Sequence, residues 1–419
     1  WAHAGAMLLA TLAMVFVLAA PLDLAAVAFA MERSADATRL WTDVFDPAWN
    51  AREVALWLSV LALSAPLALL LEAAVVRAMG RVPVGVIDRW SVGYVRVWLK
   101  TGAVRTAGDW LSGTLFWPAW LRLAGMRLGP QCEISGIIDV VPEHVTIGAR
   151  TFFADGIYLG GPRVHRGTVS VRPTVVGHDT FVGNHAVIPC GETLEPELVL
   201  GVCTVANAAT MPRGTAWFGR PAFELPRRET VEMDRRLTHD PSPIRYLNRV
   251  LWELARFALP LPIAVVQLAW VKAIAAWAPR SSSVVLLGVA VPGATLAAAG
   301  VLCTGVLGLK WLLLGRVRPG RHALWSCWCS RWDFVYVAWQ KWANLVLQRL
   351  EGTFILPAYL RLMGLKLGKR VVLGPEFAQV VDPDMIEIGD YATAAPAFQA
   401  HTFEDRVLKV DYVKIGAGA

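Results

Sequence analysis

The chain has 419 residues, of which 55% are hydrophobic and only 17% are charged, and its net charge is +7. Soluble domains carry about 25% charged residues, so this composition indicates a membrane protein. The positive charge does not indicate a nucleic-acid partner, because no nucleic-acid-binding motif occurs and basic flanks of membrane helices account for it.

Four apolar stretches are each long enough to cross a bilayer, which takes about 20 helical residues. They cover residues 4–31, 54–79, 257–271 with their flanks, and 283–309. The first stretch lacks a basic segment and a small-residue cleavage site, which favours a membrane helix over a signal peptide. The sequence therefore predicts two transmembrane α-helical hairpins whose partner is the lipid bilayer.

Lys and Arg residues cluster directly after the second and the fourth predicted helix. Such clusters stay on the cytoplasmic side of a membrane. We therefore predict a multi-pass protein of the cell membrane in which both large loops are cytoplasmic. The predicted domains are a first hairpin (1–79), a first loop domain (80–247), a second hairpin (248–314) and a second loop domain (315–419).

Each loop domain opens with a stretch rich in Trp, Val and Arg, at residues 89–110 and 325–349. Such a composition is typical of an amphipathic helix that lies on the membrane surface. The alternative is a helix that packs on the folded part of its own loop domain. The sequence leaves both interpretations open.

The two loop domains repeat each other. Residues 113–129 and 352–368 are identical at ten of seventeen positions, with a constant offset of 239. This spacing is too long for a solenoid repeat, so it indicates a duplicated module. The module consists of a transmembrane hairpin, an amphipathic segment and a folded domain.

A period of six residues runs through the first loop domain. Aliphatic residues recur six apart, with small residues four positions after several of them; the aliphatic positions are Val176, Val182, Ile188, Leu194 and Leu200. Three such hexapeptides make one triangular coil, and stacked coils bury a core that one coil cannot bury alone. We therefore predict left-handed parallel β-helix domains of the hexapeptide-repeat type. The second one is expected to be truncated at the chain end.

Candidate chemistry lies on a polar loop of the second module, His401-Thr-Phe-Glu-Asp-Arg406. His401 would be a general base, Glu404 or Asp405 would orient it, and Arg406 would hold a carboxylate or a phosphate. The alternative is a polar loop with local salt bridges. The first module has Gly160-Gly-Pro near this place, so we expect it to be degenerate, with His165 as an alternative base.

Other site classes have no support in the sequence. The six cysteines show no paired zinc spacing, so we predict reduced structural thiols and no metal site. Phosphate-binding glycine loops, the serine-hydrolase elbow and the zinc-protease motif are all absent from the sequence.

Several of these residues together resemble a known family. They are Leu314-Gly-Arg-Val-Arg-Pro-Gly320, Trp325-Ser326, Arg331-Trp332, Gly352-Thr353, Leu360-Arg-Leu-Met-Gly364, Ile388-Gly389 and the loop from His401 to Arg406. The set is similar to the membrane-bound C-terminal region of nonribosomal peptide synthetases of the ε-poly-L-lysine synthetase type. In that family, tandem domains similar to hexapeptide acyltransferases follow an adenylation and a carrier domain.

The resemblance implies that this region joins a carrier-bound aminoacyl thioester to an amino-acid amine, as a ligase component that is part of a longer protein. The cofactor would be the phosphopantetheine of the upstream carrier domain. A third tandem domain could complete a pseudo-trimer. Two alternatives remain at this point: a membrane-associated acyl- or acetyl-CoA transferase, which would use acyl-CoA, and a non-catalytic scaffold.

Overall fold

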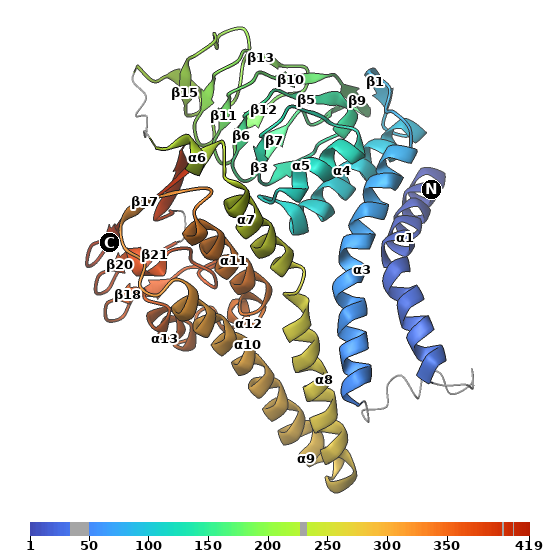
Figure 1. Cartoon of the computed structure of the whole chain (residues 1–419), viewed down its shortest axis with the longest axis vertical. Helices are drawn as coiled ribbons and strands as arrows, with labels where there is room; N and C mark the ends of the chain where they lie inside the picture. Colours follow the sequence, from blue (N-terminus) through green and yellow to red (C-terminus); the bar gives the residue numbers. More distant parts are fainter. Residues whose placement is uncertain (34–49, 227–232, 396–397, 405) are drawn as a thin grey trace. The chain divides into compact units, whose positions relative to one another are not determined.

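The computed structural model describes residues 1–33, 50–226, 233–395, 398–404 and 406–419 (Figure 1). The chain forms two compact units. The first contains residues 1–24 and 64–232, and the second contains residues 25–63 and 233–419. The connector between the first two predicted membrane helices, 34–49, lies outside the described residues.

Within the described residues, four segments are long and apolar enough to cross a membrane, as the sequence predicts. They are Ala2–Leu24 within helix α1 (Ala2–Arg33), Ala51–Ala78 (α3), Arg235–Arg280, and Ser283–Leu313. The third contains α6 (Arg235–Thr238), α7 (Pro243–Arg256) and α8 (Pro260–Trp277), and the fourth contains α9 (Ser283–Val285) and α10 (Val291–Leu313).

Three sheets of parallel strands form the faces of a coil in the first unit. Strands β5 (Val145–Ile147), β6 (Phe152–Phe153) and β7 (Ile157–Leu159) belong to three different sheets. Strands β10 (Thr174–Val176), β11 (Phe181–Val182) and β12 (Val187–Ile188) then pair with them in the same order. The chain thus visits three faces in each turn, as a hexapeptide coil requires.

Further strands extend these three faces. The first face also holds β2 (Arg127–Leu128) and β13 (Thr193–Leu194), and the third holds β4 (Ile137–Ile138). The second face also holds β3 (Glu133–Ile134), β14 (Val199–Leu200), β15 (Ala216–Phe218) and the antiparallel β16 (Phe223–Glu224).

The six-residue period determines which side chains fill the coil. The five aliphatic residues predicted to point inward are all at most 2% exposed. Thr180, Ala186 and Thr204, the small residues predicted for the corners, are also buried. A Cβ atom on Gly148 would lie 2.4 Å from the backbone nitrogen of His178 in the next turn. Stacked turns therefore approach too closely for a side chain at that glycine.

A hairpin sheet and two helices flank the coil. The sheet holds β1 (Gly85–Asp88), β9 (Thr168–Val171) and β8 (Arg163–His165), all antiparallel. Helix α4 (Val92–Leu111) begins at Ser91, whose hydroxyl accepts the Tyr94 N–H, and it packs against β4. Helix α5 (Phe116–Ala124) follows. Of the two sequence interpretations, packing on the domain is thus observed for this stretch.

The second unit repeats this order. Its hairpin sheet holds β17 (Gly320–Ala323), β23 (Val407–Val410) and β22 (His401–Glu404), and its helices are α11 (Cys327–Lys341), α12 (Asn344–Leu347) and α13 (Ile355–Leu362). Its coil strands are β18 (Lys366–Leu367), β20 (Ile386–Ile388) and β24 (Val413–Ile415), with β19 (Val372–Leu373) paired to β21 (Thr393–Ala394).

The two modules share a backbone frame as well as an element order. The N–H of Val82 donates to Glu143, which follows Pro142 in a short 3-10 turn. In the second module, the N–H of Val317 donates to Asp384, at the same place in the turn Pro383–Met385. The duplication predicted from the sequence therefore extends to long-range hydrogen bonds.

Candidate active site

The hairpin of β22 and β23 holds His401 at the edge of the second coil. His401 begins β22 and pairs with Val410. Successive residues of a strand point to opposite faces, so His401 and Phe403 share one face. The Trp332 ring, from α11, contacts both of them edge to face, with its centroid 5.2 Å from that of His401 and 6.3 Å from that of Phe403.

Asp382 approaches His401 from the segment before the Pro383–Met385 turn. Its Oδ2 atom lies 3.0 Å from Nδ1 of His401, and the two side chains are 0% and 11% exposed. Within the described residues neither atom has a hydrogen-bond partner, so the contact is a close pairing of the carboxylate and the ring nitrogen without hydrogen-bond geometry. Asp382 has a left-handed backbone (φ 56°), a conformation that Asp adopts more readily than most residues.

Two aromatic side chains of α11 hold the other carboxylate oxygen. The indole N–H of Trp332 donates to Oδ1 of Asp382 over 2.8 Å. The Tyr336 hydroxyl accepts the N–H of Asp382 over 2.8 Å and donates to Oδ1 over 3.3 Å. Burial, together with the nearby charge of Asp382, holds the pKa of Tyr336 well above its usual value. Tyr336 therefore remains a hydrogen-bond donor near neutral pH.

This arrangement favours one nitrogen of His401 for chemistry. A carboxylate beside Nδ1 favours the tautomer that carries its proton there. The Nε2 atom is then an acceptor, and no described residue donates a hydrogen bond to it. A buried carboxylate beside a histidine ring is one arrangement that supports general-base catalysis.

A second histidine lies near the same carboxylate. His322, on β17, stacks on Trp328 with ring centroids 3.6 Å apart, and its buried Nε2 has no hydrogen-bond partner among the described residues. Burial lowers the pKa of His322, and the charge of Asp382 opposes that shift only in part. His322 is therefore a neutral imidazole near neutral pH.

The other sequence-predicted residues lie apart from Nδ1 of His401. Glu404 pairs with Lys409 and lies on the opposite face of the hairpin, so Asp382, rather than Glu404, contacts His401. Arg406 is buried in the turn at the far end of the hairpin, with φ 64°. Asp405 lies outside the described residues. His165, the alternative base, is exposed on β8.

We call the place occupied by His401, Asp382, Trp332, Tyr336 and His322 the corner of the second module. The equivalent corner of the first module is apolar except for Thr101. Strand registers and helix starts align the two modules residue by residue. The polar positions of the second module are occupied in the first by Pro162 (for His401), Val141 (for Asp382), Val97 (for Trp332), Thr101 (for Tyr336) and Ile87 (for His322). Val97 and Val141 belong to a buried cluster with Val82, Val169 and Val171, and Ile87 packs against it.

Sequence reasoning missed Asp382, Trp332, Tyr336 and His322 as parts of the site. The signal for Asp382 lay in the repeat itself. The short turn before the coil strand reads Val141-Pro142 in one copy and Asp382-Pro383 in the other. A buried carboxylate in place of an aliphatic residue of the same frame lowers the stability of the fold unless it is paired. Such a replacement therefore indicates a functional site.

Comparisons with known proteins agree with the resemblance noted above. No family model matches the chain. Over 389 residues, which are 88% of this chain and 28% of the relative, it is 31% identical to the delta-poly-L-ornithine synthetase of Acinetobacter baumannii. The resemblance to poly-amino-acid synthetases is thereby confirmed. The chain spans little more than a quarter of that relative's length.

Among solved structures, the chain is similar to a maltose O-acetyltransferase of Clostridium difficile (12% identity, 32% of this chain and 89% of that one, TM-score 0.20). It is also similar to a serine acetyltransferase of Neisseria gonorrhoeae (15% identity, 48% and 95%, TM-score 0.19). At these TM-scores the two likenesses carry no argument about the site.

Proposed function

We propose that this chain is the acyltransferase-like, amide-bond-forming region of a membrane-bound poly-amino-acid synthetase, with its reacting site at His401. The observation that carries the proposal is the buried contact between Nδ1 of His401 and Asp382, in a chain that resembles such a synthetase. The first module, with its apolar corner, would have a structural role.

In the proposed reaction, Nε2 of His401 takes a proton from the attacking amine of an amino acid. The amine nitrogen of the amino acid bonds to the carbonyl carbon of an aminoacyl thioester, and the carbon–sulfur bond breaks. The proton then passes from His401 to the departing thiolate. Asp382 stabilises the imidazolium that forms between the two transfers. The thioester would be carried by phosphopantetheine on an upstream carrier domain, which an adenylation domain loads.

The direct test reconstitutes the chain in nanodiscs with an aminoacyl N-acetylcysteamine thioester and a free amino acid, and measures amide product by mass spectrometry. Wild type should form the amide, and His401→Ala should reduce turnover by about 10²- to 10⁴-fold, the usual contribution of a general base. His165→Ala is the matched control and should stay near wild type. Product from acetyl-CoA but not from the aminoacyl thioester would contradict the proposal.

We further propose that the coils are left-handed, that both face the cytoplasm, and that a third tandem domain completes a pseudo-trimer. Basic residues after the second and fourth membrane helices support the orientation. Cysteine labelling from outside the cell tests the orientation. Ser34 and Arg228, one in each of the connecting segments to be compared, lie outside the described residues. In a cysteine-free background, a single cysteine introduced at Ser34 should react with an impermeant maleimide in intact cells. A second variant, which retains the exposed Cys203 as its single cysteine, should react only after lysis.

A further inference from the structure

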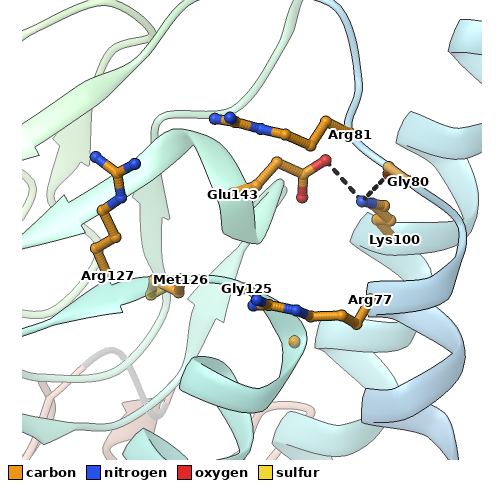
Figure 2. A pocket seen from close by; sticks show the side chains of 9 residues that line it. Arg77, Gly80, Arg81, Lys100, Gly125, Met126, Arg127 and Glu143 are labelled. Atoms are coloured by element: carbon orange, nitrogen blue, oxygen red, sulfur yellow. Dashed lines mark hydrogen bonds and ion pairs between the residues drawn. The ribbon is translucent and has the colours of Figure 1, made fainter.

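A basic cavity in the first unit lies where the membrane helix α3 ends. It has a volume of about 380 Å³ and is lined by Arg77, Arg81, Lys100, Arg127 and Glu143, together with Gly80 and residues 124–126. Figure 2 shows the Arg77 and Arg81 side chains on opposite sides of Glu143, with Arg127 on the side of Glu143 away from Lys100. Four cations against one carboxylate leave this cavity with a net charge of +3.

Two of these charges neutralise each other and form the floor of the cavity. Nζ of Lys100 lies 2.6 Å from Oε1 of Glu143, and the two side chains are 2% and 9% exposed. Burial would raise the pKa of Glu143, but hydrogen bonds from Lys100 and from the Val82 N–H outweigh it and hold the pKa below its usual value. The buried Oε2 atom of Glu143 has no hydrogen-bond partner among the described residues.

The three arginines are the charges left for a ligand. Within the described part of the chain, Arg77, Arg81 and Arg127 make no ion pair with a carboxylate. All three are exposed. Guanidinium groups recognise phosphate by paired, charge-assisted hydrogen bonds.

An apolar cavity adjoins the basic one and shares Arg77 with it. Its volume is about 590 Å³, and its apolar lining consists of Leu70, Ala74, Ala78 and Leu123. Leu70, Ala74 and Ala78 belong to the segment of α3 that is apolar enough to cross a membrane. The two cavities thus offer a charged compartment at the membrane surface and an apolar one alongside the membrane helix.

We propose that this pair of cavities binds an anionic phospholipid, with the phosphate among the three arginines and an acyl chain along α3. A headgroup hydroxyl, as in phosphatidylglycerol, would donate to the free Oε2 of Glu143. The net positive charge disfavours zwitterionic headgroups. The second module lacks this site, because Leu312 stands in the place of Arg77.

The test measures binding of phosphatidylglycerol to the detergent-solubilised chain by native mass spectrometry, with phosphatidylcholine and inorganic phosphate as separate probes. The pocket variant is Arg77→Gln with Arg127→Gln. The matched control is Arg163→Gln with Arg166→Gln, two exposed arginines of the same unit. The melting temperature of each variant verifies that it is folded.

At about fivefold per basic residue near a membrane surface, the pocket variant should bind phosphatidylglycerol about 25-fold more weakly. The control variant should change less than twofold, and phosphatidylcholine should bind weakly to all three proteins. Equal losses in the pocket and control variants would overturn the proposal, as would equal binding of the two lipids. Binding of inorganic phosphate without phosphatidylglycerol would overturn the assignment to a lipid.

Discussion

The two modules build one backbone frame around two different corners. In both, a strand hairpin, a helix that begins at a serine and a proline turn meet at the edge of a coil. The first module fills this corner with valines, and the second fills it with Asp382 and His401. The frame therefore does not need the Asp382 and His401 side chains at this corner in order to fold.

The difference has an energetic meaning. A carboxylate buried without partners costs several kcal/mol, whereas a valine at the same place stabilises the fold. In the second module, Trp332 and Tyr336 donate hydrogen bonds to Asp382 and offset that cost. In the first module, apolar side chains fill the same place in the frame. The polar side chains of the second module are therefore best explained by chemistry at His401.

The largest expected effect comes from Asp382→Asn. The amide retains the volume and still accepts from Trp332, but it removes the charge that orients and stabilises the His401 ring. Turnover in the thioester assay should fall by about 10²-fold or more. Glu387→Gln, which alters an exposed carboxylate of the same coil, is the control and should remain within twofold of wild type. Wild-type turnover in Asp382→Asn would remove the carboxylate from the mechanism.

The next effect tests the shared frame rather than the corner. Lys100→Met leaves Glu143 buried without its cation, which should lower the free energy of unfolding by about 3–5 kcal/mol. Lys366→Met breaks the solvent-exposed pair with Glu387 and should cost less than about 1 kcal/mol. Thermal unfolding in detergent measures both variants. Equal costs would contradict the structural role of the Lys100–Glu143 pair.

A smaller effect is expected from Tyr336→Phe. The substitution leaves the buried N–H of Asp382 unpaired, which should cost about 1–3 kcal/mol of stability. The equivalent position in the first module is Thr101, whose hydroxyl donates to a carbonyl within its own helix. Thr101→Val should therefore change stability by less than about 1 kcal/mol. Similar losses of unfolding free energy in both variants would contradict the proposed difference between the two corners.

The smallest effect is a pH dependence that only the second corner should show. Because the pKa of His322 is lowered in the folded state, the unfolded chain binds more protons below about pH 6.5. Stability from this group is thus present above pH 6.5 and is lost as the pH falls from there toward the folded pKa. The slope for one proton is at most about 1.4 kcal/mol per pH unit.

His322→Ile copies the residue of the first module, Ile87, into the second corner. Unfolding midpoints measured between about pH 7 and pH 5 should therefore depend less on pH in this variant than in wild type. An unchanged pH dependence would show that another group titrates there.

The parts of the fold that could be predicted are those determined by local patterns. The six-residue period identified the buried face of the coil, because each position in a hexapeptide has one fixed environment. Apolar length identified the candidate membrane segments, and the 239-residue offset identified the duplication. His401 was selected from its polar neighbours alone.

The partner of His401 could not be found in this way, because long-range contacts determine it. Asp382 lies nineteen residues before His401, and Trp332 and Tyr336 come from a helix about 50 residues earlier still. The sequence could have predicted that Glu404 points away from His401, since residues three apart in a strand point to opposite faces. Its loop had to be recognised as strand β22 before that rule could be applied.

The most direct test of the central claim is chemical rescue at His401. Peptide formation by His401→Ala is measured in nanodiscs with and without added imidazole, beside a His401→Ala, Asp382→Asn double variant. If Nε2 of His401 is the base, imidazole should restore turnover of the single variant at least about tenfold, and restore it less in the double variant, where the carboxylate that orients the ring is missing. A folded His401→Ala protein with wild-type turnover, or one that imidazole does not rescue, would contradict the account.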